Sequence, residues 1–353
     1  MRHSHSPSIL RLVICSLLLF VFSACGVATP AATDTQVFPL APTDELGGLS
    51  IENAATLQSL EKLDDYPFYV MYYTGSYKYP PIGSIFPKLG DFSCSLFATL
   101  GDEKDRLYGR NFDWQSSPAL LLFTDPPDGY ASVSMVDLTF LGITIEASQK
   151  LTDQPLDERT ALLDAPSMPF DGMNEYGLTI GMAAVPGEYL DDASYEKSRP
   201  RIGSIGIIRQ VLDHARTVEE ALEFFGQYNI DFSGGPPIHY LIADRSGKAV
   251  LIEFYQGKMV QLPNEAPWHL ATNHLRCIAQ GDGSCPRYHL LSERLAALRG
   301  KVEPGEAMQL LADVAQASTQ WSSVYDISSG DIYIAIGQSY DDIHEFHLDL
   351  QSP

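Results

Sequence analysis

Residues 94–114 read CSLFATLGDEKDRLYGRNFDW, and this stretch decides how the rest of the chain is interpreted. Two segments with alternating apolar residues, 95–100 and 106–110, flank the acidic stretch GDEKD, whose composition is typical of a turn. We therefore predict a β-hairpin over these residues. Such a hairpin brings Cys94, at its start, close to Arg110 and Asp113 at its end.

These three residue types together suggest nucleophilic chemistry. Arg110 favours a Cys94 thiolate by charge attraction, whereas Asp113 is suited to hold a cation. If the chain is cut before Cys94, that residue supplies both a thiol and a terminal amine, and the amine can act as the base. The plainer alternatives are a small buried cysteine and a surface ion pair worth about 0–1 kcal/mol.

The spacing adds a resemblance to this chemistry, because Arg110 follows Cys94 by 16 positions and Asp113 follows it by 19. The segment resembles the choloylglycine hydrolase, penicillin V acylase and acid ceramidase group of N-terminal-nucleophile hydrolases, in which a terminal Cys is followed by Arg and Asp at these offsets. The resemblance runs from Cys94 nearly to the C-terminus. It implies a hydrolase of linear amides that needs no cofactor, acts on a small-molecule N-acyl amide, and matures by cutting its own bond between Ser93 and Cys94.

Three downstream residues join the candidate site through this resemblance. Asn174, in the segment GMNEYGL, matches a motif whose Asn helps to form the oxyanion hole, although Asn-Glu-Tyr-Gly is equally typical of a turn. Asn273, in the pair Thr272-Asn273, resembles the second oxyanion-hole or orienting amide of the family, and Arg287, in the segment SCPRY, resembles its distal arginine. His239, at the start of a predicted strand, is expected to be structural.

A cluster of cysteine and histidine lies in the same region. His274, Cys277, Cys285 and His289 have a spacing that superficially resembles a zinc site. In an exported protein, a disulfide between Cys277 and Cys285 is the simpler interpretation, and free thiols are the other alternative. No metal or other cofactor is expected.

The first 24 residues have the pattern of an export signal. Arg2 and Arg11 precede an apolar run over residues 12–22, and small residues stand before Cys25. A cysteine in this place resembles the bacterial lipoprotein box, so we expect lipidation of Cys25 and attachment to the cell envelope on its extracytoplasmic side. Ordinary secretory cleavage is an alternative, and a retained anchor is a weaker one because the run is shorter than the ~20 residues of a membrane span.

The remaining chain divides into three parts. Residues 25–50 are rich in Ala, Thr and Pro and read as a flexible tether. Residues 51–93 predict a helix over 51–63 and a strand over 68–73, in a segment that cutting releases and that stays packed on the rest. Residues 94–353 form the catalytic domain.

Composition limits the class of protein. A chain of 353 residues with 45% hydrophobic content supports a substantial core, and a net charge of −22 argues against nucleic acid and anionic membrane surfaces as partners. The pattern of strands and helices indicates an α+β protein, and the resemblance implies a four-layer αββα sandwich. An acyltransferase of the same fold and a non-catalytic binding lipoprotein remain alternatives, and the oligomeric state and the particular amide stay open.

Overall fold

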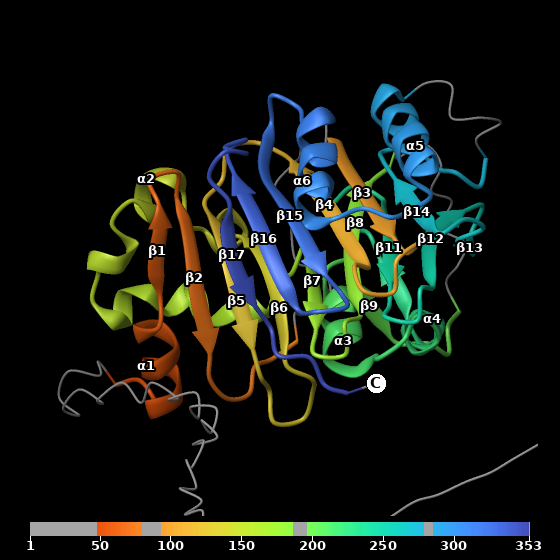
Figure 1. Cartoon of the computed structure of the whole chain (residues 1–353). Coiled ribbons are helices and arrows are strands. Elements are labelled where there is room, and N and C mark those ends of the chain that lie inside the picture. Colours follow the sequence, from red (N-terminus) through yellow and green to blue (C-terminus); the bar gives the residue numbers. More distant parts are fainter. Residues whose placement is uncertain (1–47, 80–92, 186–195, 234, 279–284, 353) are drawn as a thin grey trace, which may run out of the picture. The chain divides into compact units, whose positions relative to one another are not determined.

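The predicted hairpin is confirmed in the computed structural model, which describes residues 48–79, 93–185, 196–233, 235–278 and 285–352 (Figure 1). Its strands are β3 (Ser93–Thr99) and β4 (Leu107–Asp113), which run antiparallel with Cys94 opposite Phe112. The export signal, Cys25 and the tether as far as residue 47 lie outside the described residues. No helix within the described ranges is long and apolar enough to cross a membrane.

The hairpin belongs to a six-stranded sheet in the order β14-β3-β4-β15-β16-β17. The other strands of this sheet are β14 (Trp268–Ala271), β15 (Thr319–Asp326), β16 (Asp331–Ile336) and β17 (His344–His347). Two helices, α5 (Pro286–Leu298) and α6 (Pro304–Asp313), cover one face of the sheet (Figure 1). They bury Leu291 and Leu311 against Phe97 and Val324 of the strands.

A nine-stranded sheet, in the order β1-β2-β5-β6-β7-β8-β11-β12-β13, lies against the other face. Its strands are β1 (Glu61–Asp64), β2 (Phe68–Tyr73), β5 (Ala119–Thr124), β6 (Ser132–Asp137), β7 (Asp171–Asn174), β8 (Thr179–Ala184), β11 (Ile238–Ala243), β12 (Ala249–Tyr255) and β13 (Lys258–Pro263). The far side is covered by α3 (Gly206–His214) and α4 (Val218–Gln227), whose N-cap residue is Thr217. A short parallel pair, β9 (Arg201–Gly203) and β10 (Asn229–Asp231), flanks these helices.

The segment before Cys94 is part of the nine-stranded sheet. Helix α1 (Ile51–Gln58) is followed by β1 and β2, and β2 pairs in parallel with β5. The predicted helix over 51–63 is therefore too long, because the Ser59 hydroxyl ends it by binding the carbonyls of Thr56 and Tyr72. The short helical turns α2 (Ile145–Ser148), η2 (Leu138–Leu141), η3 (Leu151–Asp153) and η4 (Leu156–Ser167) follow β6.

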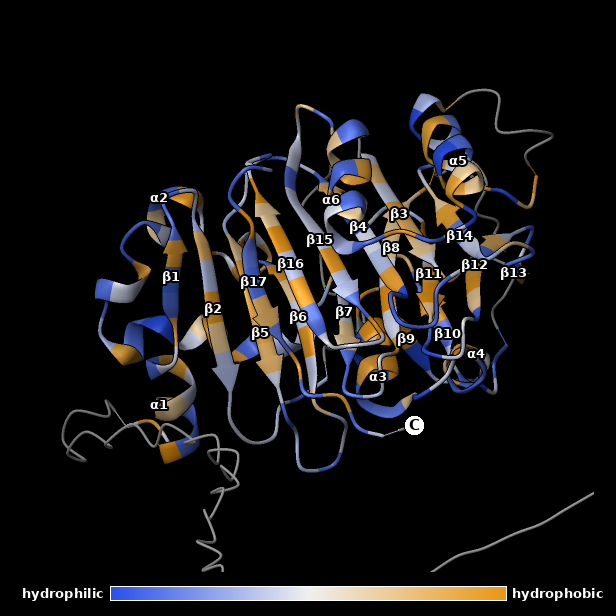
Figure 2. Cartoon of the chain, viewed as in Figure 1, coloured by the Kyte–Doolittle hydropathy of each residue, from blue (hydrophilic) through white to orange (hydrophobic). Residues whose placement is uncertain are grey.

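The two sheets meet face to face between the two helical layers, which confirms the predicted four-layer αββα sandwich. Side chains from both sheets, such as Leu96, Tyr108 and Leu241, form one continuous core, and apolar residues run along the strands in Figure 2. The Tyr108 hydroxyl crosses the interface and donates to the Leu241 carbonyl at 2.9 Å. Gly181 makes this possible, since a Cβ there would lie 2.7 Å from that hydroxyl.

Candidate active site

Cys94 occupies the second position of β3, where alternation along the strand turns its sulfur toward the sheet interface. The residue is only 2% exposed. Its neighbour Ser95 points the opposite way, toward α5, and accepts a hydrogen bond from Arg287 at 2.9 Å. The nucleophile candidate thus has its sulfur in the core and its backbone facing a polar network.

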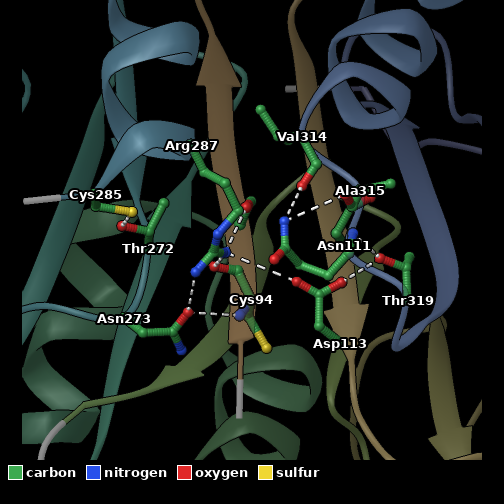
Figure 3. Close-up of polar contacts among 12 residues, drawn as sticks. Cys94, Asn111, Asp113, Thr272, Asn273, Cys285, Arg287, Val314, Ala315 and Thr319 are labelled. Carbon is green, nitrogen blue, oxygen red and sulfur yellow. Dashed lines mark hydrogen bonds and ion pairs between the residues drawn. The ribbon is translucent and has the colours of Figure 1, made fainter. Parts of the chain in front are cut away.

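That network consists of Asn273 and Arg287, which hold both backbone polar groups of Cys94 (Figure 3). The Asn273 Oδ1 accepts from the Cys94 N–H at 2.7 Å, and its Nδ2 donates to the Ala184 carbonyl at 2.8 Å. Arg287, in the first turn of α5, donates Nη1 to the Cys94 carbonyl at 2.6 Å and Nη2 to Asn273 Oδ1 at 2.9 Å. The structure therefore brings together three of the predicted residues that lie far apart in sequence.

Asp113, at the end of β4, is fully buried and stands opposite Ser93 in the strand pairing. Thr319 donates its hydroxyl to Oδ1 at 2.5 Å, while Arg287 Nη1 lies 3.7 Å from Oδ2. Within the described residues, Oδ2 has no hydrogen-bond partner. Burial raises the pKa of this carboxyl from 3.8 to about 6, even though Thr319 and the arginines oppose the shift.

Arg110, in the middle of β4, places Nη2 3.9 Å from the Cys94 sulfur. Its Nη1 forms an ion pair with Asp171, and both side chains are almost completely buried. Burial nevertheless raises the pKa of the Cys94 thiol, with Arg110 acting in the opposite direction. This environment favours the neutral thiol, so a thiolate at Cys94 would need a base to take the proton.

The structure does not place Asn174 at this site, and its predicted oxyanion role is wrong. The Nδ2 group of Asn174 donates to the carbonyls of Leu212 and Ala215, and Oδ1 accepts from two backbone N–H groups of the β7–β8 turn. That turn precedes β8, whereas Ala184, which contacts Asn273, ends it. The five residue steps from Thr179 to Ala184 span roughly 17 Å of strand, so the hydrogen bonds of Asn174 support the turn interpretation of this motif.

Cys277 and Cys285 are free thiols in the structure, so the expected disulfide is not formed. The two sulfurs lie in different environments. Burial raises the pKa of Cys277 to about 12, and Glu253 adds to this shift. For Cys285, hydrogen bonds from His274 and Thr272 outweigh burial and lower the pKa to about 6.

Other titratable residues in this region have structural roles. His239 is buried and bonds through Nδ1 to Glu253 at 3.1 Å, as expected for a structural histidine. Glu253 also accepts from the backbone N–H groups of Arg276 and Cys277, which fixes the loop after Asn273. Among the described residues, no group of three or more His, Cys, Asp or Glu side chains is arranged to hold a metal ion.

Sequence reasoning missed two supporting residues. Thr319, at the start of β15, offered no signal, because nothing in the sequence links it to Asp113. Asp171 offered a faint one, since it lies directly before the segment GMNEYGL that contains Asn174. In both cases the contact depends on which strands become neighbours across or within the sheets.

A small cleft of about 10 Å³ opens beside the Cys94 sulfur. Apart from Arg110 its walls are apolar: Phe112, Phe170, Met182, Ala184, Pro236 and Ile238. A roomier cavity of about 570 Å³ lies at the other end of β4, around Arg106 and Arg216. The smaller cleft is the candidate active site because Cys94 lines it, whereas neither cysteine nor histidine lines the larger cavity.

Solved structures with the same fold include two amide hydrolases. The conjugated bile acid hydrolase from Clostridium perfringens is 16% identical, with a TM-score of 0.55 over 72% of this chain and 92% of that one. Penicillin V acylase from Agrobacterium tumefaciens is 18% identical, with a TM-score of 0.51 over 72% and 87%. At these identities the similarity establishes the fold.

A family model extends the relationship beyond the fold. Residues 157–341, more than half of the chain, match the model described as acyl-coenzyme A:6-aminopenicillanic acid acyl-transferase. The matched part begins after β4, so it includes Asn273 and Arg287 but not Cys94. On this match, the chain belongs to the acyl-coenzyme A:6-aminopenicillanic acid acyl-transferase family.

Proposed function

We propose that this protein is an N-terminal-nucleophile hydrolase of linear amides, with Cys94 as the nucleophile after the Ser93–Cys94 bond is cut. The convergence of Asn273 and Arg287 on the backbone N–H and carbonyl of Cys94 is the observation that carries the proposal. An ordinary buried cysteine in a strand has no need of two side chains that fix its own peptide groups. A residue that must become a chain terminus in a defined position needs such side chains to hold its nitrogen and carbonyl.

In the proposed cut, the Cys94 sulfur attacks the Ser93 carbonyl carbon and the peptide nitrogen takes a proton. The Ser93–Cys94 amide becomes a thioester, and water then releases a Ser93 carboxylate and a Cys94 with free amine and thiol. The Asn273 Oδ1, already bonded to the Cys94 nitrogen, keeps that nitrogen in place as it changes from amide to amine. Asp113, opposite Ser93, then offers its free Oδ2 to the ammonium.

Substrate turnover follows the same chemistry. The Cys94 amine takes the thiol proton, and the thiolate attacks the amide carbonyl of the substrate. Asn273 uses one amide hydrogen for the Ala184 carbonyl and has a second for the developing oxyanion. Arg110 stabilises the thiolate, the ammonium protonates the leaving amine, and water hydrolyses the thioester.

The apolar walls of the cleft indicate the acyl side of the substrate. Phe112, Phe170 and Met182 offer aromatic and aliphatic surface beside Cys94, which suits apolar atoms next to the reacting carbonyl, although the cleft itself has room for only about one water-sized group. The solved relatives are named for a conjugated bile acid and for penicillin V. A panel of N-acyl amides, varied first in acyl length and then in leaving amine, tests this substrate class.

We further propose that the segment before Cys94 stays bound after the cut. Beyond the β2–β5 pairing, Tyr77 and Tyr79 donate their hydroxyls to the two carboxylate oxygens of Asp213 in α3, at 2.7 and 3.0 Å. Tyr79 also contacts His214 at 2.8 Å. Size-exclusion chromatography of cut protein should therefore show both pieces in one peak.

Export and lipid attachment through Cys25 remain part of the proposal. The support is the sequence pattern of residues 1–25 alone. Labelling of cells with a radioactive fatty acid should mark the wild-type protein and leave Cys25→Ser unlabelled. A soluble, unlabelled wild-type protein would favour ordinary secretion.

An acyltransferase is the second candidate, because the matching family model is named for acyl transfer to 6-aminopenicillanic acid. In that reaction an amine, rather than water, resolves the Cys94 thioester. Product analysis with and without added amine separates the two activities. N-acyl product that grows with amine concentration at the expense of free acid would identify the transferase.

Intact-mass analysis is the decisive experiment for the nucleophile. Wild-type protein should contain a fragment that begins at Cys94, Cys94→Ala should remain uncut and inactive, and Cys94→Ser should be cut slowly if at all. Active protein that is still continuous through Ser93 would refute the mechanism. An uncut chain without activity toward the panel would instead indicate a binding lipoprotein.

A further inference from the structure

Asp171 is a buried carboxylate outside the residues assigned so far. It lies at the start of β7, has no exposed surface, and stands opposite Gly181 of β8. Three side chains of the other sheet point their donors at it. They are Arg110 through Nη1, the Tyr325 hydroxyl at 2.5 Å and the Ser323 hydroxyl at 3.4 Å.

The same guanidinium links this carboxylate to the nucleophile. While Nη1 of Arg110 pairs with Asp171, Nη2 donates to the Met182 carbonyl at 3.1 Å and faces the Cys94 sulfur at 3.9 Å. The ring of Phe112 lies 4.9 Å from the guanidinium carbon. Arg110 is thus held in one place, with an anion on one side and the reacting sulfur on the other.

Two acceptors that share one cation compete for it. A carboxylate in hydrogen-bond contact attracts Arg110 more strongly than a sulfur nearly 4 Å away. We infer that Asp171 is a positioning residue that holds Arg110 in place and takes up part of its charge, so that the Arg110–Asp171 pair together sets the reactivity of Cys94. This inference rests on the proposed role of Cys94 as the nucleophile.

The inference gives opposite signs for two substitutions. Arg110→Gln removes the cation and leaves the anion, so the Cys94 pKa should rise. Asp171→Asn keeps an oxygen acceptor for Arg110 but removes the competing charge, so the Cys94 pKa should fall by about one pH unit. The double variant removes a neutral pair and should return close to the wild-type value.

NMR titration of an isotope-labelled Cys94 Cβ measures this pKa without reference to amidase activity or to cutting. The resonance is assigned with Cys94→Ala, and intact mass ensures that only chains in the same state, cut or uncut, are compared. An Asp171→Asn midpoint equal to wild type, or a double variant that follows Arg110→Gln, would overturn the inference. Because the readout is the thiol itself, failure here differs from failure of the proposed hydrolase, which would show as an uncut, inactive chain.

Arg110→Gln and Asp171→Asn each leave a buried charge without its partner, which can prevent folding. In that case Tyr325→Phe is the variant that tests the inference. Loss of this hydroxyl leaves Asp171 with fewer donors and a stronger hold on Arg110, so the Cys94 pKa should rise by a few tenths of a pH unit. Tyr240→Phe is the matched control, because Tyr240 is equally buried and donates to the Ser204 carbonyl instead. Equal midpoints for the two variants would show that Asp171 only supports the fold.

Discussion

The Asp113 carboxyl makes a quantitative prediction about the uncut chain. Its pKa of about 6, against the ordinary 3.8, means that the folded chain binds this proton more tightly than the unfolded chain does. The group is protonated in both states well below pH 4 and ionised in both well above pH 6. Between these limits the free energy of unfolding must fall as pH rises, in total by about 3 kcal/mol.

The measurement uses Cys94→Ala, which cannot cut itself, and compares it with Cys94→Ala/Asp113→Asn. Urea unfolding of both proteins gives the difference in their free energies of unfolding at each pH. This difference should move by about 3 kcal/mol in favour of the Asn variant between about pH 4 and pH 7. Any constant offset from an imperfect fit of the amide beside Arg287 cancels, because only the change with pH is interpreted.

Asp137 has a similarly raised pKa but does not disturb this comparison. Burial also raises its pKa to about 6, but it belongs to β6 and lies outside the candidate site. Its contribution is the same in both proteins and drops out of the comparison. A difference that stays flat with pH, or that moves in favour of Asp113, would refute the electrostatic account of this carboxylate.

Two further predictions concern groups that support the site. Thr319→Val removes the hydroxyl that binds Asp113, so the pKa of that carboxyl should rise further. Cutting, followed by intact mass, should slow by about tenfold. Thr319→Ser keeps the hydroxyl and should cut at close to the wild-type rate. Tyr77→Phe and Tyr79→Phe each remove one hydrogen bond to Asp213, worth about 1 kcal/mol or more. The double variant should lose its N-terminal piece at lower urea concentration than cut wild type, and unchanged retention would mean that β-strand pairing alone holds the pieces together.

Local signals made the β3–β4 hairpin and strand β2 predictable. Alternating apolar residues on both sides of an acidic turn fix the pairing of β3 with β4, and this pairing brings Arg110 and Asp113 to Cys94 without knowledge of the rest of the fold. Asn273 and Arg287 lie 179 and 193 positions from Cys94, so pattern reasoning alone could not place them. Only the resemblance to a known family linked them to the site.

The same resemblance failed where geometry within a strand matters. A motif fixes which residues follow one another, but not which end of β8 lies beside the nucleophile. Asn174 stands before β8 and makes the hydrogen bonds of the turn, whereas the end at Ala184 reaches Asn273. Asp171 was overlooked for a related reason, since its partners Arg110 and Tyr325 come from the opposite sheet.

The Asp113 carboxyl also provides a test of what cutting changes. It is a buried carboxylate with one oxygen lacking a hydrogen-bond partner within the described residues, and it stands opposite Ser93, whose bond to Cys94 is the one that we propose is cut. A new ammonium at Cys94 would supply this oxygen with a further cation beside Arg287, and an added positive charge lowers the pKa of a carboxyl. The titration midpoint of an isotope-labelled Asp113 carboxyl should therefore be lower in cut wild type than in Cys94→Ala, by about one pH unit or more. Equal midpoints in the two proteins would mean that the amine does not face Asp113, and the orienting role proposed for this residue would have to be abandoned.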